Sequence, residues 1–270
     1  MGNFKFSPAP QLRGADQPLV ACRLSWHPPY SAAEVEQFDG TWKVKTCPRC
    51  AWEAIHTGAI GSAEQLQAAS DFAADELNRR LIATGIQPRF RGCTFENYRL
   101  TEGNPEEAKA LVACRGYAEQ FDVNLREGRG LLLVGNLGTG KTHLASAIVQ
   151  HVVREHDAWA VITTAAEICR VIRGSYGKGA GYTETDALDE LASTDLLVID
   201  EIGVQSGSDF APGVMNDVID RRYQRMRPTI LISNRPAAEL SQFIGDRALD
   251  RMRQGGKAIG FSWQSARAAL

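Results

Sequence analysis

The sequence predicts an α/β fold, in which a parallel sheet of five strands is covered by helices and a smaller region precedes it. From residue 105 onward, short apolar segments alternate with stretches whose apolar residues recur at helical spacing, a pattern typical of parallel sheets. A glycine-rich loop joins the first apolar segment to a predicted helix. Residues 1–60 differ in character, since prolines there mix with aromatic residues, cysteines and histidines. That composition indicates a small, loop-rich module.

The overall composition excludes several classes of protein. The 270 residues carry 30 Lys and Arg against 32 Asp and Glu, and 44% are hydrophobic, which is typical of a globular protein and not of a disordered one. A net charge of -2 argues against coating nucleic acid by bulk electrostatics, although a local basic strip is still compatible with it. There is no apolar run near the roughly 20 residues of a membrane span and no secretory signal. We therefore expect a cytoplasmic protein without a membrane partner, whose six cysteines are reduced thiols or metal ligands.

The elements follow in chain order. A helix is predicted over residues 62–84, because Ser62 and Gln65 resemble a capping box and apolar residues recur at three- and four-residue steps. Gly85 and Pro88 end it. The predicted strands cover residues 131–134, 159–163, 196–199, 229–233 and 257–261.

The sharpest motif follows the first of these strands. Residues 135–142 read GNLGTGKT, which fits G-x-x-x-x-G-K-[S/T] and opens a helix predicted from Lys141 to about His151. In such a loop, backbone N–H groups surround phosphate oxygens, the lysine reaches the β- and γ-phosphates, and the threonine hydroxyl ligates Mg²⁺. The motif predicts a site for ATP and Mg²⁺ formed by Gly135, Asn136, Leu137, Gly138, Thr139, Gly140, Lys141, Thr142 and the next residue, His143.

Two further strand ends support hydrolysis of ATP. The strand at 196–199 runs into Asp200 and Glu201, so Asp200 is expected to hold the Mg²⁺ shell and Glu201 to polarise the attacking water as a general base. Asn234 follows the strand at 229–233. If that strand lies between the other two, Asn234 would sit beside the γ-phosphate and help to position the water. The alternative for Asn234 is a cap of the next helix.

Four segments together resemble the DnaC family of helicase loaders, which are AAA+ ATPases: 93–99 (CTFENYR), 196–205 (LLVIDEIGVQ), 245–253 (GDRALDRMR) and 261–267 (FSWQSAR). The resemblance covers about residues 90–267. It implies an AAA+ P-loop core without a full helical lid, and ATP hydrolysis coupled to helicase loading. The implied partners are a replicative hexameric DNA helicase of the DnaB type, single-stranded DNA, and further copies of the chain through the ATPase interface.

The resemblance also assigns residues. The arginine finger, which would reach the γ-phosphate of a neighbouring subunit, falls on Arg251 with Arg247 as the second candidate, and a second sensor arginine falls on Arg267. The alternative for this arginine group is a solvated helix face. Tyr176, Ser208 and Phe210 match positions that face single-stranded DNA. Independently, residues 173–182 form a basic segment with tyrosines, which suits base stacking but would also suit a surface loop.

The N-terminal region carries a candidate zinc site. Cys47 and Cys50 have the C-x₂-C spacing that lets two thiolates converge on one ion. Phage DnaC-like proteins carry a Cys/His pair ahead of such a motif, and this resemblance points to Zn²⁺ held by Cys22, His27, Cys47 and Cys50. A redox pair or unliganded thiols are the alternatives. Cys93, Cys114 and Cys169 have no partner spacing and are expected to pack as small apolar residues.

We therefore predict a zinc-binding, helicase-interacting module over residues 1–60, a helix and linker over 61–104, and an AAA+ ATPase domain over 105–270. Three alternatives stay open: a transposition helper ATPase of the IstB type acting on duplex DNA, a small-molecule P-loop kinase, and a nucleotide-dependent switch with negligible turnover. A basic cluster made by Arg221, Arg222, Arg225 and Arg227 is expected on a solvated helix or a subunit interface.

Overall fold

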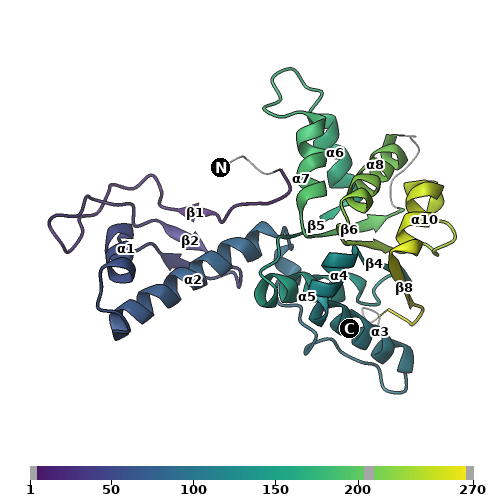
Figure 1. The fold of residues 1–270 in the computed structure, drawn as a ribbon, viewed down its shortest axis with the longest axis horizontal. Helices are drawn as coiled ribbons and strands as arrows, with labels where there is room; N and C mark the ends of the chain where they lie inside the picture. The colour runs from purple at the N-terminus through teal and green to yellow at the C-terminus, as the bar shows by residue number, and fades with distance from the viewer. Residues whose placement is uncertain (1–4, 204–209, 266–270) are drawn as a thin grey trace. The chain divides into compact units, whose positions relative to one another are not determined.

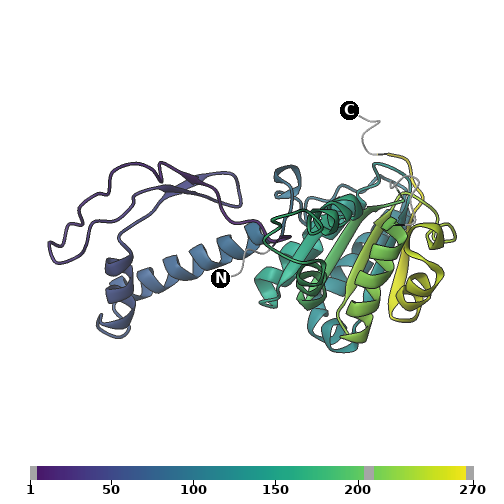
Figure 2. The same cartoon turned by 90° about the horizontal axis from the view of Figure 1, so that it is seen from above.

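The computed structural model describes residues 5–203 and 210–265, which form two compact units (Figures 1 and 2). The smaller unit is Pro8–Ala83, and the larger one combines the residues before Pro8 with those from Thr84 onward. These limits differ from the predicted domain boundaries. The long helix groups with the smaller unit, while residues 84–104 and the first residues of the chain group with the ATPase core.

The larger unit is built on a parallel sheet of five strands in the order β5-β6-β7-β4-β8. The strands are β4 (Gly130–Gly135), β5 (Ala160–Thr164), β6 (Leu196–Ile202), β7 (Thr229–Ser233) and β8 (Gly256–Phe261). Each predicted strand is present with its ends shifted by three residues at most. β7 lies between β4 and β6, as the interpretation of Asn234 required. The predicted α/β fold is confirmed.

Helices cover both faces of this sheet (Figure 1). α3 (Pro105–Glu119), α4 (Phe121–Glu127) and α5 (Lys141–Glu155) lie on one face. The other face carries α6 (Ala165–Gly174), α7 (Glu184–Ser193), α8 (Phe210–Gln224), the short α9 (Ser241–Ile244) and α10 (Asp246–Gln254). A 3₁₀ turn, η1, spans Pro88–Phe90. α5 extends one turn beyond the predicted end at His151, because Val152 and Val153 continue its buried face.

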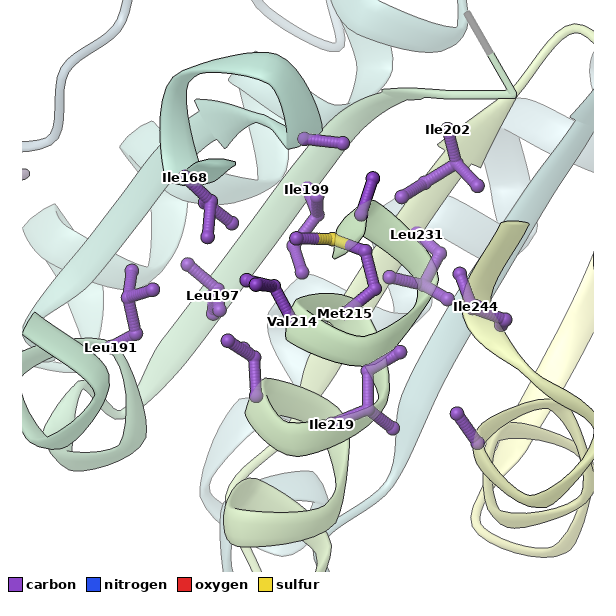
Figure 3. Packing of buried hydrophobic residues seen from close by; sticks show 14 of the residues in the cluster. Ile168, Leu191, Leu197, Ile199, Ile202, Val214, Met215, Ile219, Leu231 and Ile244 are labelled. Atoms are coloured by element: carbon purple, nitrogen blue, oxygen red, sulfur yellow. The ribbon is translucent and has the colours of Figure 1, made fainter. Parts of the chain in front are cut away.

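The core lies between the sheet and helices α6 to α10 (Figure 3). Leu197, Ile199 and Leu231 project from the strands toward Ile168 of α6 and Met215 of α8, and all five are fully buried. Each such side chain contributes about 1.5–3 kcal/mol when it leaves water. Strands buried on both faces are expected to be continuously apolar, which is why the periodicity of the sequence identified them. The packed strands hold the carboxyl ends of β4, β6 and β7 at one edge.

The basic cluster is neutralised within the fold. Arg222 is completely buried and donates hydrogen bonds to the hydroxyls of Thr194 and Thr229 and to three carbonyls, those of Leu191, Thr194 and Pro228. Burial lowers the pKa of its guanidinium to about 9. Arg221 and Arg225 pair with Asp189, and Arg227 pairs with Asp195. The cluster is therefore neither a free cationic surface nor a uniformly solvated helix face.

The smaller unit combines an antiparallel sheet, β1 (Leu12–Arg13), β2 (Glu34–Glu36) and β3 (Trp42–Val44), with helices α1 (Pro48–His56) and α2 (Ala63–Ala83). Asn78 of α2 ties helix and sheet together, since its side chain accepts from the Phe38 N–H at 2.7 Å and donates to the Glu36 carbonyl at 3.0 Å. The Ser62 hydroxyl accepts from the Gln65 N–H at 3.2 Å, as the predicted cap required. Within the described residues, no helix has the length and apolarity needed to cross a membrane.

Candidate functional site

The glycine-rich loop joins β4 to α5 in a conformation that needs its glycines. Gly138 and Gly140 have φ angles of 72° and 87°, in the left-handed region that favours glycine. A Cβ at Gly140 would lie 2.5 Å from the ring of Tyr98, and one at Gly138 would lie 2.0 Å from the Ser265 hydroxyl. The loop is therefore packed from outside by residues on both sides of it in the sequence.

The loop borders a cavity of about 550 Å³, within the range of small-molecule sites. The lysine of the motif, Lys141, is buried, and its ammonium donates to the Gly135 carbonyl at 2.8 Å and to the Asn136 carbonyl. The cavity is lined by residues 5–6, 85–87, 89–90, 137–143, 146, 162–164, 167, 200–201, 232 and 234. Of the predicted nucleotide-binding residues, those from Leu137 to His143 line it directly, together with Asp200.

The acidic pair lies where β6 breaks its pairing with β7. The register shifts between Ile199 and Ile202, a local irregularity that is common beside active sites. The Thr142 hydroxyl donates to Asp200 Oδ2 at 2.8 Å, so the two predicted magnesium ligands are already adjacent. Burial raises the pKa of the Asp200 carboxyl, against the opposing effect of the Thr142 hydroxyl.

Glu201 is exposed at the rim of the cavity, and its φ of 60° is unusual for a residue other than glycine. Such backbone strain concentrates at functional sites. Asn234 follows the last residue of β7, is exposed, and lines the same cavity. The structure therefore brings the phosphate loop, both acids and the asparagine around one space.

Sequence reasoning missed several residues at this site, including the following two groups. Residues 85–87, 89 and 90 line the cavity, although their sequence indicated only the end of a helix. Tyr98 and Trp263 both donate to the Thr139 carbonyl, at 2.9 and 3.2 Å. The resemblance had marked the segments that contain these two residues, but it gave neither of them a role.

Those predicted arginine and DNA-binding residues that the structure describes lie outside the cavity. Arg247 is exposed, whereas Arg251 forms an ion pair with Asp220 and its Cζ lies 5.1 Å from the ring centre of Tyr223. Tyr176 is 60% exposed and donates to Glu184 at 2.9 Å. Phe210 opens α8, and the guanidinium of Arg173 lies over its ring at 4.6 Å. Ser208 and Arg267 lie outside the described residues.

The smaller unit gathers the four predicted metal ligands. One ligand atom each from Cys22, His27, Cys47 and Cys50 lies within 4.8 Å of all the others. Cys22 Sγ and Cys50 Sγ are 3.4 Å apart, and His27 Nδ1 lies 3.2 to 3.7 Å from the three sulfurs. Tetrahedral zinc, with bonds of about 2.3 Å to sulfur and about 2.0 Å to nitrogen, needs separations of roughly 3.5–3.8 Å. The donor set fits that ion.

Two neighbouring features also suit a metal. His27 Nε2 lies 2.9 Å from the Glu53 carboxylate, and Nδ1 faces the sulfurs. Metal-bound histidines commonly hydrogen-bond a carboxylate through the ring nitrogen that does not bind the metal. Burial alone would raise the pKa of Cys47, but hydrogen bonds from the Cys50 backbone and the Cys22 side chain lower it to about 7, whereas burial and the Cys22 and Cys47 thiols raise the pKa of Cys50 to about 11. A thiolate is the form that binds metal. Elsewhere, Cys114 and Cys169 are buried as expected, while Cys93 is half-buried.

Comparison with known proteins identifies the family. The family model described as IstB-like ATP binding protein matches residues 99–254. The chain is 36% identical over 197 residues to the replicative helicase loader DnaC of Escherichia coli K12, covering 72% of this chain and 77% of the relative. It is 35% identical over 193 residues to the protein of the same name from Buchnera aphidicola subsp. Schizaphis graminum, covering 71% and 76%.

A crystal structure of the DnaC helicase loader shares the fold, with a TM-score of 0.59 and 22% identity over 65% of this chain and all of that one. The match of the family model over more than half of the chain and the identity to DnaC relatives lead to one conclusion. The chain belongs to the IstB-like ATP-binding family of AAA+ ATPases and is related to the replicative helicase loaders of the DnaC type.

Proposed function

We propose that this chain is an ATP-dependent loader that binds a replicative hexameric DNA helicase of the DnaB type and delivers it to single-stranded DNA during replication initiation or restart. The observation that carries the proposal is the 36% identity to a protein named replicative helicase loader, over most of both chains. The cavity that gathers a phosphate loop, two acids and an asparagine supplies the ATPase that such a loader would use.

Within the cavity, each residue takes a role that its chemistry allows. Lys141 and the loop N–H groups would bind the phosphates of ATP, and the Thr142 hydroxyl and Asp200 would hold Mg²⁺, which neutralises the charge that develops on the phosphates. Glu201, exposed at the rim, would take a proton from the attacking water. Asn234 would orient that water. The lining residues 85–87, 89 and 90 are available to contact the nucleoside part of ATP.

A neighbouring subunit would complete the site. Arg251 is the first candidate for the arginine that reaches the γ-phosphate of a neighbour, and it would have to leave Asp220 to do so. Arg247, one turn earlier on α10, is exposed without such a rearrangement and is the second candidate. Arg267 would serve as the second sensor. This proposal requires self-association through the ATPase interface.

Single-stranded DNA would contact the segment between α6 and α7 and the start of α8. The 60% exposure of Tyr176 supports a stacking role, because aromatic faces bind bases with little sequence preference. Arg173, which lies against Phe210, supplies positive charge beside it. Ser208 would complete the contact.

We infer that the smaller unit binds one Zn²⁺ through Cys22, His27, Cys47 and Cys50, and that it contacts the helicase. The ion would cross-link a loop-rich region to α1, since Cys22 and His27 lie in the loop between β1 and β2 and the other two ligands stand at the start of that helix. Large apolar side chains on this unit are exposed, among them Trp26 and Trp52 at 71% and 52%. Such residues suit a protein partner.

Co-purification with the replicative helicase of the host, with and without ATP, tests the function. Stable stoichiometric binding that changes with ATP is expected of a loader. A preference for duplex DNA without helicase binding would instead support an IstB-type transposition helper, and phosphorylation of a metabolite would support a kinase.

A further inference from the structure

The first described residues belong to the ATPase unit, although the residues that follow them along the chain, from Pro8 onward, belong to the smaller unit. The N–H groups of Lys5 and Phe6 donate to the two carboxylate oxygens of Glu190 on α7, at 2.6 and 2.8 Å. Phe6 is 5% exposed and belongs to the same hydrophobic core as Ile168. We call residues 5–7 the strap, because they are fixed to this unit by both backbone and side chain.

The strap also forms part of the nucleotide cavity. Lys5 and Phe6 line it, on the same wall as residues 85–87. A Cβ at Gly85 would lie 3.6 Å from the Phe6 carbonyl and 2.9 Å from that of Ile162, so the two segments and β5 are tightly packed there. The Thr84 carbonyl accepts from the Ile162 N–H at 2.8 Å. Nothing in the local sequence of residues 5–7 indicates this placement.

This wall is where the chain leaves the ATPase unit and where it returns. The smaller unit begins at Pro8 and ends at Ala83, so its two covalent connections are the residues that follow the strap and the residues that precede Thr84. A ligand that touches the wall therefore contacts residues that stand next to both connections.

We propose that the strap is a wall of the ATP site, and that ATP binding and strap docking stabilise one another. The inference rests on the proposed assignment of the cavity to ATP. If docking completes the surface that the nucleotide contacts, ATP binds the docked form more tightly, and by thermodynamic reciprocity bound ATP favours docking by the same factor. ATP would then control how firmly the smaller unit is tethered at its first connection.

Amide hydrogen exchange provides a direct test, because the two N–H groups bonded to Glu190 report on docking. In the parent protein, saturating Mg²⁺ and ATPγS should slow exchange at Lys5 and Phe6 by about fivefold or more. The Lys141→Ala variant, which loses a phosphate contact, should lack this effect. The variants Glu190→Gln and Phe6→Ala should each raise the dissociation constant for ATPγS, by at most the factor measured in exchange. Glu119→Gln, an exposed carboxylate on α3, is the matched control and should bind like the parent.

The outcomes distinguish a failure of the strap proposal from a failure of the proposed function. If Glu190→Gln and Phe6→Ala both bind ATPγS like the parent while their Tm falls, the strap is only a structural anchor and the proposal is wrong. Unchanged exchange at Lys5 and Phe6 on nucleotide binding would also overturn it. A parent protein that binds no ATPγS would instead remove the assignment of the cavity, and the proposed function with it.

Discussion

The carbonyl of Thr139 offers the sharpest test of how the phosphate loop is held. It accepts from the Tyr98 hydroxyl at 2.9 Å and from the Trp263 indole N–H at 3.2 Å, and Thr139 is only 2% exposed. Neither donor lines the cavity. Because the peptide bond is planar and trans, a carbonyl held away from the cavity turns the following N–H, that of Gly140, toward it. The two side chains therefore orient one of the N–H groups that would bind phosphate.

The size of the effect follows from how many donors remain. Tyr98→Phe removes one hydrogen bond of about 0.5–1.5 kcal/mol and leaves the Trp263 donor, so ATP affinity should fall by roughly two- to twelvefold. Trp263→Phe should act similarly through its hydrogen bond, in addition to any change in packing. The double variant loses both hydrogen bonds and also leaves the buried carbonyl without a donor, an additional cost of about 1–3 kcal/mol that neither single variant carries. We predict a loss larger than the sum of the single losses by about 1 kcal/mol.

A double-mutant cycle measures this coupling, because packing effects specific to one site cancel. The assay is titration calorimetry of Mg²⁺ and ATPγS with all four proteins, alongside urea unfolding of each without nucleotide. Strictly additive losses of ATP affinity would refute the shared-carbonyl argument. Unchanged affinity with lowered stability would mean that the two bonds stabilise the fold without orienting the loop.

Three further predictions concern the proposed roles. Glu201→Gln should keep ATP binding and nearly abolish turnover, measured as phosphate release; turnover at the parent level would remove its role as base. The purified protein should contain about one zinc per chain by metal analysis, and Cys47→Ser should lose it; protein prepared without chelator that holds none would remove the zinc site. Arg251→Ala subunits mixed with Lys141→Ala subunits should regain some DNA-stimulated hydrolysis, since each supplies what the other lacks; a folded, co-assembled but inactive mixture would direct attention to Arg247.

The sequence could predict the site residues that lie at the carboxyl ends of the strands. Strands buried on both faces must be apolar, so the polar residues at the carboxyl ends of β6 and β7 mark the edge of the sheet. Asp200, Glu201 and Asn234 were identified in this way, and all three line the cavity with the phosphate loop. The three central strands β4, β6 and β7 were found for the same reason, because a continuous apolar run can be identified from neighbours along the chain.

The sequence could not predict features that depend on distant partners. Arg222 has the pattern of a surface residue, because buried arginines are rare. It is buried here since three carbonyls and two hydroxyls, at the end of α7 and the start of β7, accept hydrogen bonds from its guanidinium. The strap likewise depends on Glu190, which is 184 residues away from Phe6. In neither case does the sequence around Arg222 or Phe6 indicate which groups accept its hydrogen bonds.

Residues 173–182, which lead from the end of α6 toward α7 and are called here the α6–α7 segment, contact both the wall of the cavity and the proposed DNA surface. The Lys5 ammonium lies 4.4 Å from the ring centre of Tyr182, whose hydroxyl donates to the Val171 carbonyl on α6. At the other end of this segment, Arg173 lies against Phe210, where α8 begins. Coupling between two sites requires an element with two arrangements that both sites bias. The tightly packed sheet leaves little room for a second arrangement. If ATP and single-stranded DNA influence one another within a subunit, the α6–α7 segment is therefore the element through which the strap would connect them.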